Sequence, residues 1–166
     1  MKILNLVTLL ILTSNSYAVC DPNITPTAPN NRYELVNNGI EVKDLQTGLI
    51  WQRCSLGQTW SGTTCTGTAT TYNWINALRT TVNMGNGWRV PNIKELASLV
   101  EQTCYNPSIN ETYFSNTASN YYWSASPVSD EKNTAWVVNF HNGNVHGFYG
   151  ADKSNSNYVR LVRSSQ

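Results

Sequence analysis

The chain has 166 residues, enough for one domain with a hydrophobic core and little more. Eleven Lys and Arg residues against ten Asp and Glu residues give a net charge of +1, and Lys2 carries the only charge within residues 1–18. Residues 19–166 are therefore neutral overall, which argues against nucleic acid or another polyanion as a partner.

Residues 1–18 have the features of a secretory signal peptide. Lys2 precedes a short apolar stretch, residues 3–12, and Ser16-Tyr17-Ala18 places small residues at the two key positions of a cleavage site. The apolar stretch is too short to span a bilayer, and the residues before Cys20 do not resemble a lipoprotein signal. We predict cleavage after Ala18 and an exported protein (periplasmic, cell-surface or secreted) that is not inserted in the membrane.

Four cysteines in an exported chain predict two disulfides, for which three pairings are possible. The pairing of Cys54 with Cys65 is favoured because it closes a short loop rich in Gly, Thr and Ser, and it leaves Cys20 with Cys104. Neither a metal nor another cofactor is expected, since the chain has no Cys-x-x-Cys pair and neither His lies near a Cys.

The first half of the chain predicts an irregular lead-in and then short strands. Residues 19–31 contain three prolines and are predicted to be irregular. Residues 33–36 and 40–43 flank an Asn-Gly turn signal and predict a β-hairpin. Residues 49–53 predict a further strand, and residues 54–70 a loop that holds Trp60.

Two helices are predicted in the middle of the chain. Residues 72–84 carry apolar side chains at helical spacing and end at two glycines. The second helix starts at Asn92 and continues to about residue 102. Asn92 and Glu95 form the pattern of a capping box, and Pro91 keeps the residue before it extended.

The last part of the chain predicts a strand at 121–126, a polar loop at 127–133, a hairpin and a closing strand at 158–163. The hairpin joins residues 134–141 and 144–149 through Asn142-Gly143, which pairs His141 with Asn144. One face of this hairpin is predicted to join the core and the other to remain polar. The core side comprises Trp136, Val138, Phe140, Val145 and Tyr149, and the outer side comprises Asn139, His141, Asn144 and His146.

In this order the features resemble the Lcl C-terminal domain family, exported bacterial domains named after a collagen-like adhesin. The resemblance covers about residues 34–163, and its motifs are residues 44–51 (DLQTGLIW), Trp74 with Ala77, residues 87–96 (GWRVPNIKEL), 122–126 (YWSAS), 135–140 (AWVVNF) with Gly143, and 159–163 (VRLVR).

The resemblance implies an α+β, C-type-lectin-like fold, in which two helices pack on a twisted, mostly antiparallel sheet, here stabilised by disulfides. The predicted organisation is a signal peptide (1–18), a lead-in (19–31) and the domain (32–166). In the adhesin, the domain is associated with attachment to sulfated host glycans.

The candidate ligand-binding residues are polar or aromatic and follow Trp123. Oxygen-bearing side chains cluster in two predicted loops, and two histidines share the outer hairpin face. The candidates are Asp130, Asn133, His141, His146, Tyr149 and Asp152. Trp60 is expected to be the most exposed tryptophan, because the other five lie in motifs that build the scaffold.

The sequence favours a recognition protein over an enzyme. Nothing places a Ser or Thr nucleophile beside either His, and no cysteine follows Cys104, whereas formylglycine-generating enzymes need a reactive pair late in the chain. We predict an exported adhesion domain that binds a glycan or a surface protein through loops 126–133 and 149–157. The alternative is an assembly component of a surface appendage or secretion apparatus that docks to another protein.

Overall fold

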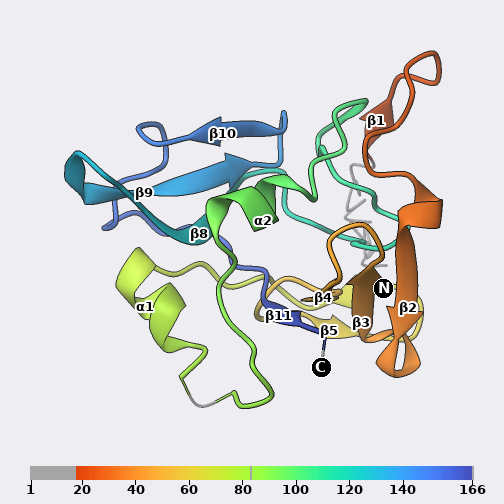
Figure 1. Ribbon diagram of the computed structural model, residues 1–166, viewed down its shortest axis with the longest axis horizontal. Helices are drawn as coiled ribbons and strands as arrows, with labels where there is room; N and C mark the ends of the chain where they lie inside the picture. The colour runs from red at the N-terminus through yellow and green to blue at the C-terminus, as the bar shows by residue number, and fades with distance from the viewer. Residues whose placement is uncertain (1–17, 83, 166) are drawn as a thin grey trace, which may run out of the picture.

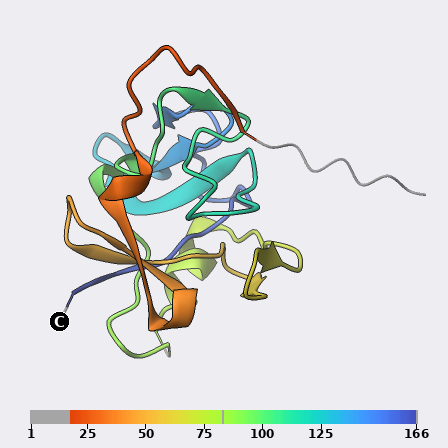
Figure 2. The ribbon, with the colours of Figure 1, turned by 90° about the vertical axis from the view of Figure 1, so that its right-hand side faces the viewer.

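The computed structural model describes residues 18–82 and 84–165. The predicted signal peptide therefore lies outside the described residues, except for Ala18. The described chain folds into short strands and two short helices, arranged as a four-stranded and a three-stranded antiparallel sheet with two two-stranded pairs (Figures 1 and 2). The architecture is α+β, and no helix within the described ranges is long and apolar enough to cross a membrane.

The four-stranded sheet has the order β11-β4-β3-β2. The predicted hairpin and the strand after it are confirmed as β2 (Tyr33–Val36), β3 (Glu41–Asp44) and β4 (Leu49–Gln52). The predicted closing strand is shorter, and β11 covers only Val162–Ser164. Residues 158–161 instead cross from β8 to β4, and Val159, Arg160 and Leu161 are all fully buried because both sides of this segment are covered.

The three-stranded sheet has the order β10-β9-β8, with β8 (Tyr121–Val128), β9 (Glu131–Asn139) and β10 (Asn144–His146). The predicted polar loop at 127–133 is wrong, because Val128 pairs with Glu131 across a tight turn at Ser129-Asp130. The start of β9 is polar and exposed and the end of β8 is Pro127-Val128, of which Val128 is half-buried, so pairing here continues beyond the buried part of the sheet.

The hairpin register differs by two residues from the predicted one. Asn139, not His141, pairs with Asn144, so the connection has four residues. The backbone of Phe140 is bonded to other segments, since its N–H donates to the carbonyl of Asn120 and its carbonyl accepts from Ser108. Phe140 is therefore unavailable to the hairpin.

Residues of β9 alternate between two hydrophobic clusters, so the sheet is covered on both faces. Val138 joins the cluster built around Trp51 and Leu96, between the two sheets. Val137 joins the cluster with Trp123 and Ala77. The predicted division into a core face and a polar face is therefore wrong: Val145 and Tyr149 are 42% and 74% exposed, whereas Val137 is fully buried.

Both helices are shorter than predicted. α1 covers Trp74–Arg79, and α2 covers Ile93–Ala97 with the predicted capping box of Asn92 and Glu95. After α1, the hydroxyls of Thr80 and Thr81 donate to the carbonyls of Ala77 and Leu78. Such bonds compete with helical hydrogen bonds, and β-branched residues are poor helix formers.

Both expected disulfides are present, Cys20–Cys104 and Cys54–Cys65. The first joins β1 (Val19–Cys20) to β7 (Cys104–Tyr105), and the second lies in a loop that holds β5 (Thr59–Trp60) and β6 (Cys65–Thr66). The lead-in is irregular but anchored, because the Glu101 carboxylate accepts the N–H groups of Thr27 and Ala28.

Candidate functional site

The edge of β9 next to β10 carries a four-residue protrusion. β10 pairs with residues 137–139, and beyond it Asp152 bridges to Thr134 on the same edge. Residues 147–151 therefore lie opposite only residues 135 and 136, and the extra residues loop out, as in a large β-bulge. We call residues 147–150, which read Gly-Phe-Tyr-Gly, the aromatic protrusion.

Two glycines anchor the protrusion on aromatic rings. Gly150 has a φ of +72°, and a Cβ there would lie 2.8 Å from ring carbons of Tyr121. A Cβ at Gly147 would lie 3.2 Å from both Trp136 and Val128. The backbone at each end of the protrusion thus packs directly on a side chain of the sheet, which only glycine permits at Gly150.

The two residues between these glycines point away from the core. Phe148 and Tyr149 are each 74% exposed. His146 lies between two tyrosines, with ring centroids 6.0 Å from Tyr121 and 5.9 Å from Tyr149, both in edge-on geometry. The result is an exposed aromatic group on a backbone fixed at both ends.

The six sequence-predicted residues do not form one site. Asp130, Asn133 and Asp152 lie near the start of β9, where the backbone of Lys153 donates to the carbonyl of Asn133. His141 lies beyond the other end of β9 and contacts Ser119 at 3.1 Å. A nine-residue strand is roughly 25–30 Å long, so His141 and Asp130 cannot contact the same small ligand.

The end of the edge that carries Asp152 is polar. The hydroxyl and the backbone N–H of Ser154 both donate to the Asp152 carboxylate, and these bonds lower its pKa below the ordinary value. The ammonium of Lys153 donates to the carbonyl of Lys132 and lies 4.6 Å from the centre of the Trp74 ring. Asp152 is therefore ionised at neutral pH, and the next residue, Lys153, holds its cation against Lys132 and Trp74.

Among residues 18–82 and 84–165, no group of three or more His, Cys, Asp or Glu side chains could hold a metal ion. The two histidines have different neighbours, Ser119 for His141 and the two tyrosines for His146. The shared histidine pair of the predicted outer face is thus absent from this part of the chain.

Phe148, Tyr121 and Trp136 also belong to this region and are not among the residues predicted from the sequence. The available signal was the pattern Gly-Phe-Tyr-Gly, in which two large rings lie between residues that allow close backbone approach. Trp60 is half-buried, and its ring lies 3.5 Å from the Arg53 guanidinium carbon.

The fold and this site define a disulfide-linked α+β domain that presents aromatic and polar groups from the edge of an antiparallel sheet. The family model described as the Lcl C-terminal domain matches residues 41–163, and the chain belongs to this family. A search of curated proteins found no match to the chain.

Proposed function

We propose that the chain is an exported recognition domain that binds a glycan or a surface protein through the aromatic protrusion and the polar edge beside it. The observation that carries the proposal is the exposure of Phe148 and Tyr149 on an anchored backbone. Large aromatic rings gain no free energy of burial while they are exposed to water. Their exposure is therefore best explained by a partner that covers them.

The fixed backbone favours affinity. Binding normally costs free energy because loops and side chains become ordered, and an anchored loop with two-angle aromatic side chains lowers that cost. A Tyr ring combines an apolar face with a hydroxyl, which suits both a sugar ring and a protein surface. Asp152 and Asn133 add hydrogen-bonding groups nearby.

The distribution of arginines supports an uncharged ligand. Arg32, Arg89 and Arg163 form ion pairs with carboxylates, and Arg53 and Arg160 donate to backbone carbonyls. Five of the six arginines are thus engaged within the fold. A polysulfated glycan, as bound by the adhesin, requires a free basic surface, so a neutral glycan fits this chain better.

The proposal includes export and a C-type-lectin-like arrangement of the domain. Two disulfides are typical of chains that fold in an oxidising compartment. Two helices packed with mostly antiparallel sheets support the arrangement that the family resemblance implies.

The test is binding of the purified protein to a glycan array and to immobilised bacterial and host surface proteins. The Tyr149→Ala and Asp152→Ala variants should lose binding, whereas Tyr105→Ala should retain it, because Tyr105 is 55% exposed on β7 and outside the site. Absence of binding to every glycan and protein, or equal binding by Tyr149→Ala, would overturn the proposal.

One observation favours the alternative, docking to a protein of a surface appendage or secretion apparatus. The side chain of Phe148 has no polar group, and Val145 on β10 is also exposed. The aromatic protrusion and the strand before it therefore present an apolar surface that suits a protein partner. A photo-crosslinking residue at position 149 would separate the two, since a single cross-linked protein band from the native envelope supports docking.

A further inference from the structure

A groove of about 210 Å³ lies away from the protrusion, between β3, β4, β5 and the segment before α2. Half-buried Trp60 and Trp88 both line it, together with Glu41, Gln52 and Thr59. We call it the tryptophan groove. In Figures 1 and 2 the four-stranded sheet lies below the three-stranded sheet, so this groove and the aromatic protrusion are separate surfaces.

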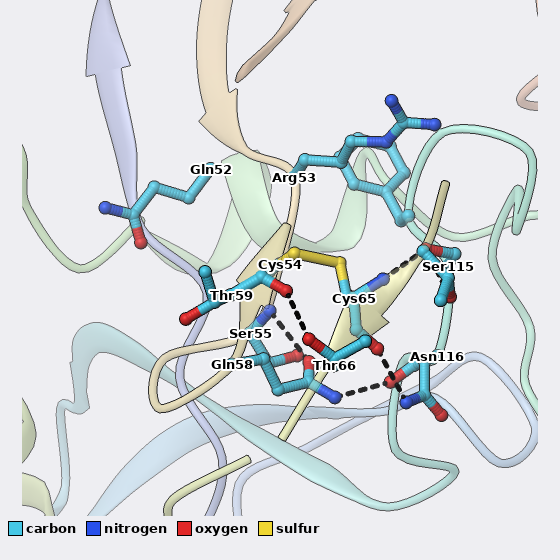
Figure 3. The surroundings of a disulfide bond; sticks show 12 residues. Gln52, Arg53, Cys54, Ser55, Gln58, Thr59, Cys65, Thr66, Ser115 and Asn116 are labelled. Carbon is cyan, nitrogen blue, oxygen red and sulfur yellow. Dashed lines mark hydrogen bonds between the residues drawn. A yellow bond between two sulfur atoms is a disulfide. The ribbon is translucent and has the colours of Figure 1, made fainter. Parts of the chain in front are cut away.

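The Cys54–Cys65 disulfide fixes the loop that brings Trp60 to the groove. Around it, the Cys65 N–H donates to the Ser115 hydroxyl, and the Asn116 amide donates to the Cys65 carbonyl (Figure 3). These bonds join the disulfide loop to a distant segment. The indole of Trp60 is therefore held in place before any ligand arrives.

Gln52 and Arg53 project to opposite sides of the chain in Figure 3. The Arg53 guanidinium stacks on the Trp60 ring, whereas the residues that line the groove include Trp60 and not Arg53. Gln52 is one of the residues that line the groove.

The groove contains hydrogen-bonding groups that nothing else engages. Within the described part of the chain, the side-chain amide of Gln52 and the hydroxyl of Thr59 have no hydrogen-bond partner, and neither do the indole N–H groups of Trp60 and Trp88. By contrast, the indoles of Trp74 and Trp123 donate to the carbonyls of Ser124 and Tyr72 at 2.8 and 2.7 Å. Unpaired groups also occur elsewhere, such as the indole N–H of fully buried Trp51, but those of the groove line a surface that a ligand can reach.

The charges around the groove disfavour a charged ligand. Arg53 already lies over Trp60, and Arg163 lies 5.3 Å from the centre of the Trp88 ring, so a quaternary ammonium would meet two cations. The Arg163 guanidinium also donates to the Glu41 carboxylate at 2.7 Å, and Arg53 donates to carbonyls, so neither arginine is free to hold an anion.

We infer that the tryptophan groove binds a single neutral sugar residue. A sugar ring presents C–H groups to an indole face and hydroxyls to amide, hydroxyl and indole N–H groups, which is the set of groups that lines the groove. The volume agrees, because pockets for drug-sized ligands start at roughly 300 Å³ and this groove is smaller. The site is independent of the protrusion, and the inference goes beyond the proposed function.

The test is a two-dimensional NMR titration that follows the indole N–H signals of the six tryptophans, assigned through single Trp→Phe variants. The probes are the methyl glycosides of glucose, galactose, mannose, N-acetylglucosamine and N-acetylgalactosamine. At least one should shift the Trp60 and Trp88 signals saturably, with a Kd of roughly millimolar. The signals of Trp74 and Trp123, whose N–H groups are already bonded, should stay in place.

Gln52→Ala should weaken the response at least tenfold, while Gln46→Ala, an exposed glutamine in the turn after β3, should leave it unchanged. Trp60→Ala should abolish the response of Trp88. The double variant Phe148→Ala/Tyr149→Ala should keep the full response, which separates this site from the proposed function.

Three results would overturn the inference: no glycoside shifts the two signals, choline chloride or sodium sulfate shifts them more than every glycoside, or Gln52→Ala behaves as wild type.

Discussion

The two halves of the molecule are stabilised in different ways. We call the lead-in, the four-stranded sheet and the disulfide loop the clamped region. The strands in this region have only two to four residues each. The Cys54–Cys65 disulfide and the ion pairs Arg32–Asp44 and Arg163–Glu41 join parts of this region, and the Cys20–Cys104 disulfide joins its lead-in to β7. In the three-stranded sheet, β8 and β9 have eight and nine residues and β10 has three. Among the described residues, this sheet contains neither a disulfide nor an ion pair.

The difference shows where this fold can leave a surface open. Long paired strands supply many ladder hydrogen bonds and bury both faces of β9, so their edge can carry a protrusion that contributes little to stability. Short strands supply few such bonds, and cross-links compensate. Variants in the clamped region should therefore change stability, and variants in the protrusion should change binding.

The largest expected effect follows from loss of the long-range disulfide. Cys20 and Cys104 are 84 residues apart, and the double variant Cys20→Ser/Cys104→Ser should lower the unfolding free energy by about 4–5 kcal/mol, since the unfolded chain gains that loop entropy. Chemical denaturation measures it. Ligand binding by the folded fraction should persist. A change below about 1 kcal/mol would show that the lead-in does not depend on the cross-link.

The next effect comes from the buried ion pair of Arg32 and Asp44. The Asp44 side chain is fully buried and accepts two bonds from the guanidinium. Asp44→Asn leaves the cation without its counter-charge and should cost about 3 kcal/mol in denaturant unfolding. Asp152→Asn, at an exposed position, is the matched control and should change stability by less than about 0.5 kcal/mol. Equal losses of unfolding free energy in Asp44→Asn and Asp152→Asn would contradict the proposed difference between the clamped region and the three-stranded sheet.

Acid should weaken the clamped region. Burial opposes the charges of Asp44 and Glu101, but hydrogen bonds from Arg32 and Thr47, and from backbone N–H groups to Glu101, outweigh it and hold both pKa values below their ordinary range. The unfolded chain therefore binds protons first as the pH falls. This contribution to stability is fully present above about pH 5 and is lost as the pH drops through the lowered folded-state pKa values.

Urea unfolding at several pH values between neutral and strongly acidic measures this loss, and Asp44→Asn should make the dependence shallower. Burial raises the pKa of Glu111, which acts in the opposite direction but is a single group. Stability that rises on acidification would refute the prediction.

A smaller loss is expected at the anchor of the protrusion. Gly150→Ala adds a Cβ against the Tyr121 ring in a left-handed backbone conformation, and should cost about 2 kcal/mol and weaken binding. Gly48→Ala is the control, since Gly48 has the same φ of +72° and open space around it. It should show only the conformational cost of about 1 kcal/mol in thermal unfolding. Equal losses of stability in Gly150→Ala and Gly48→Ala would show that the contact with the Tyr121 ring does not anchor the protrusion.

The smallest effect on stability and the largest on binding should come from Phe148→Ala. The side chain is 74% exposed, so the unfolding free energy should change by less than about 0.5 kcal/mol. Binding in the array assay should fall at least tenfold. If Phe148→Ala destabilised the fold as strongly as Asp44→Asn, the protrusion would belong to the core instead.

The sequence predicted local features well. The capping box at Asn92, the turn at Asn37-Asn38-Gly39 and both disulfides are confirmed, because each depends on residues close in sequence or on cysteine arithmetic. The family was also identified, since its motifs are local.

Features that depend on distant contacts were missed. The hairpin register follows from bonds between Phe140 and the segments at Ser108 and Asn120, which no short pattern encodes. Arg160 lies in the segment predicted as the closing strand, but it is fully buried and donates to the carbonyls of Gln52 and Arg53, with no ion pair to a carboxylate among the described residues. The protrusion itself exists because Tyr121 and Trp136 support two glycines from other strands.

The Cys20–Cys104 bond also determines how the domain responds to a mechanical pull. Force applied to the chain at Val19 passes from Cys20 through the two sulfur atoms to Cys104. These two cysteines are 84 residues apart in sequence. The residues between them, which include the four-stranded sheet up to β4 and both helices, cannot be drawn out by that pull while the disulfide is intact. In a domain held at its N-terminal side against flow, residues 21–103 would thus not be extended, whereas the strands after Cys104 would bear the force.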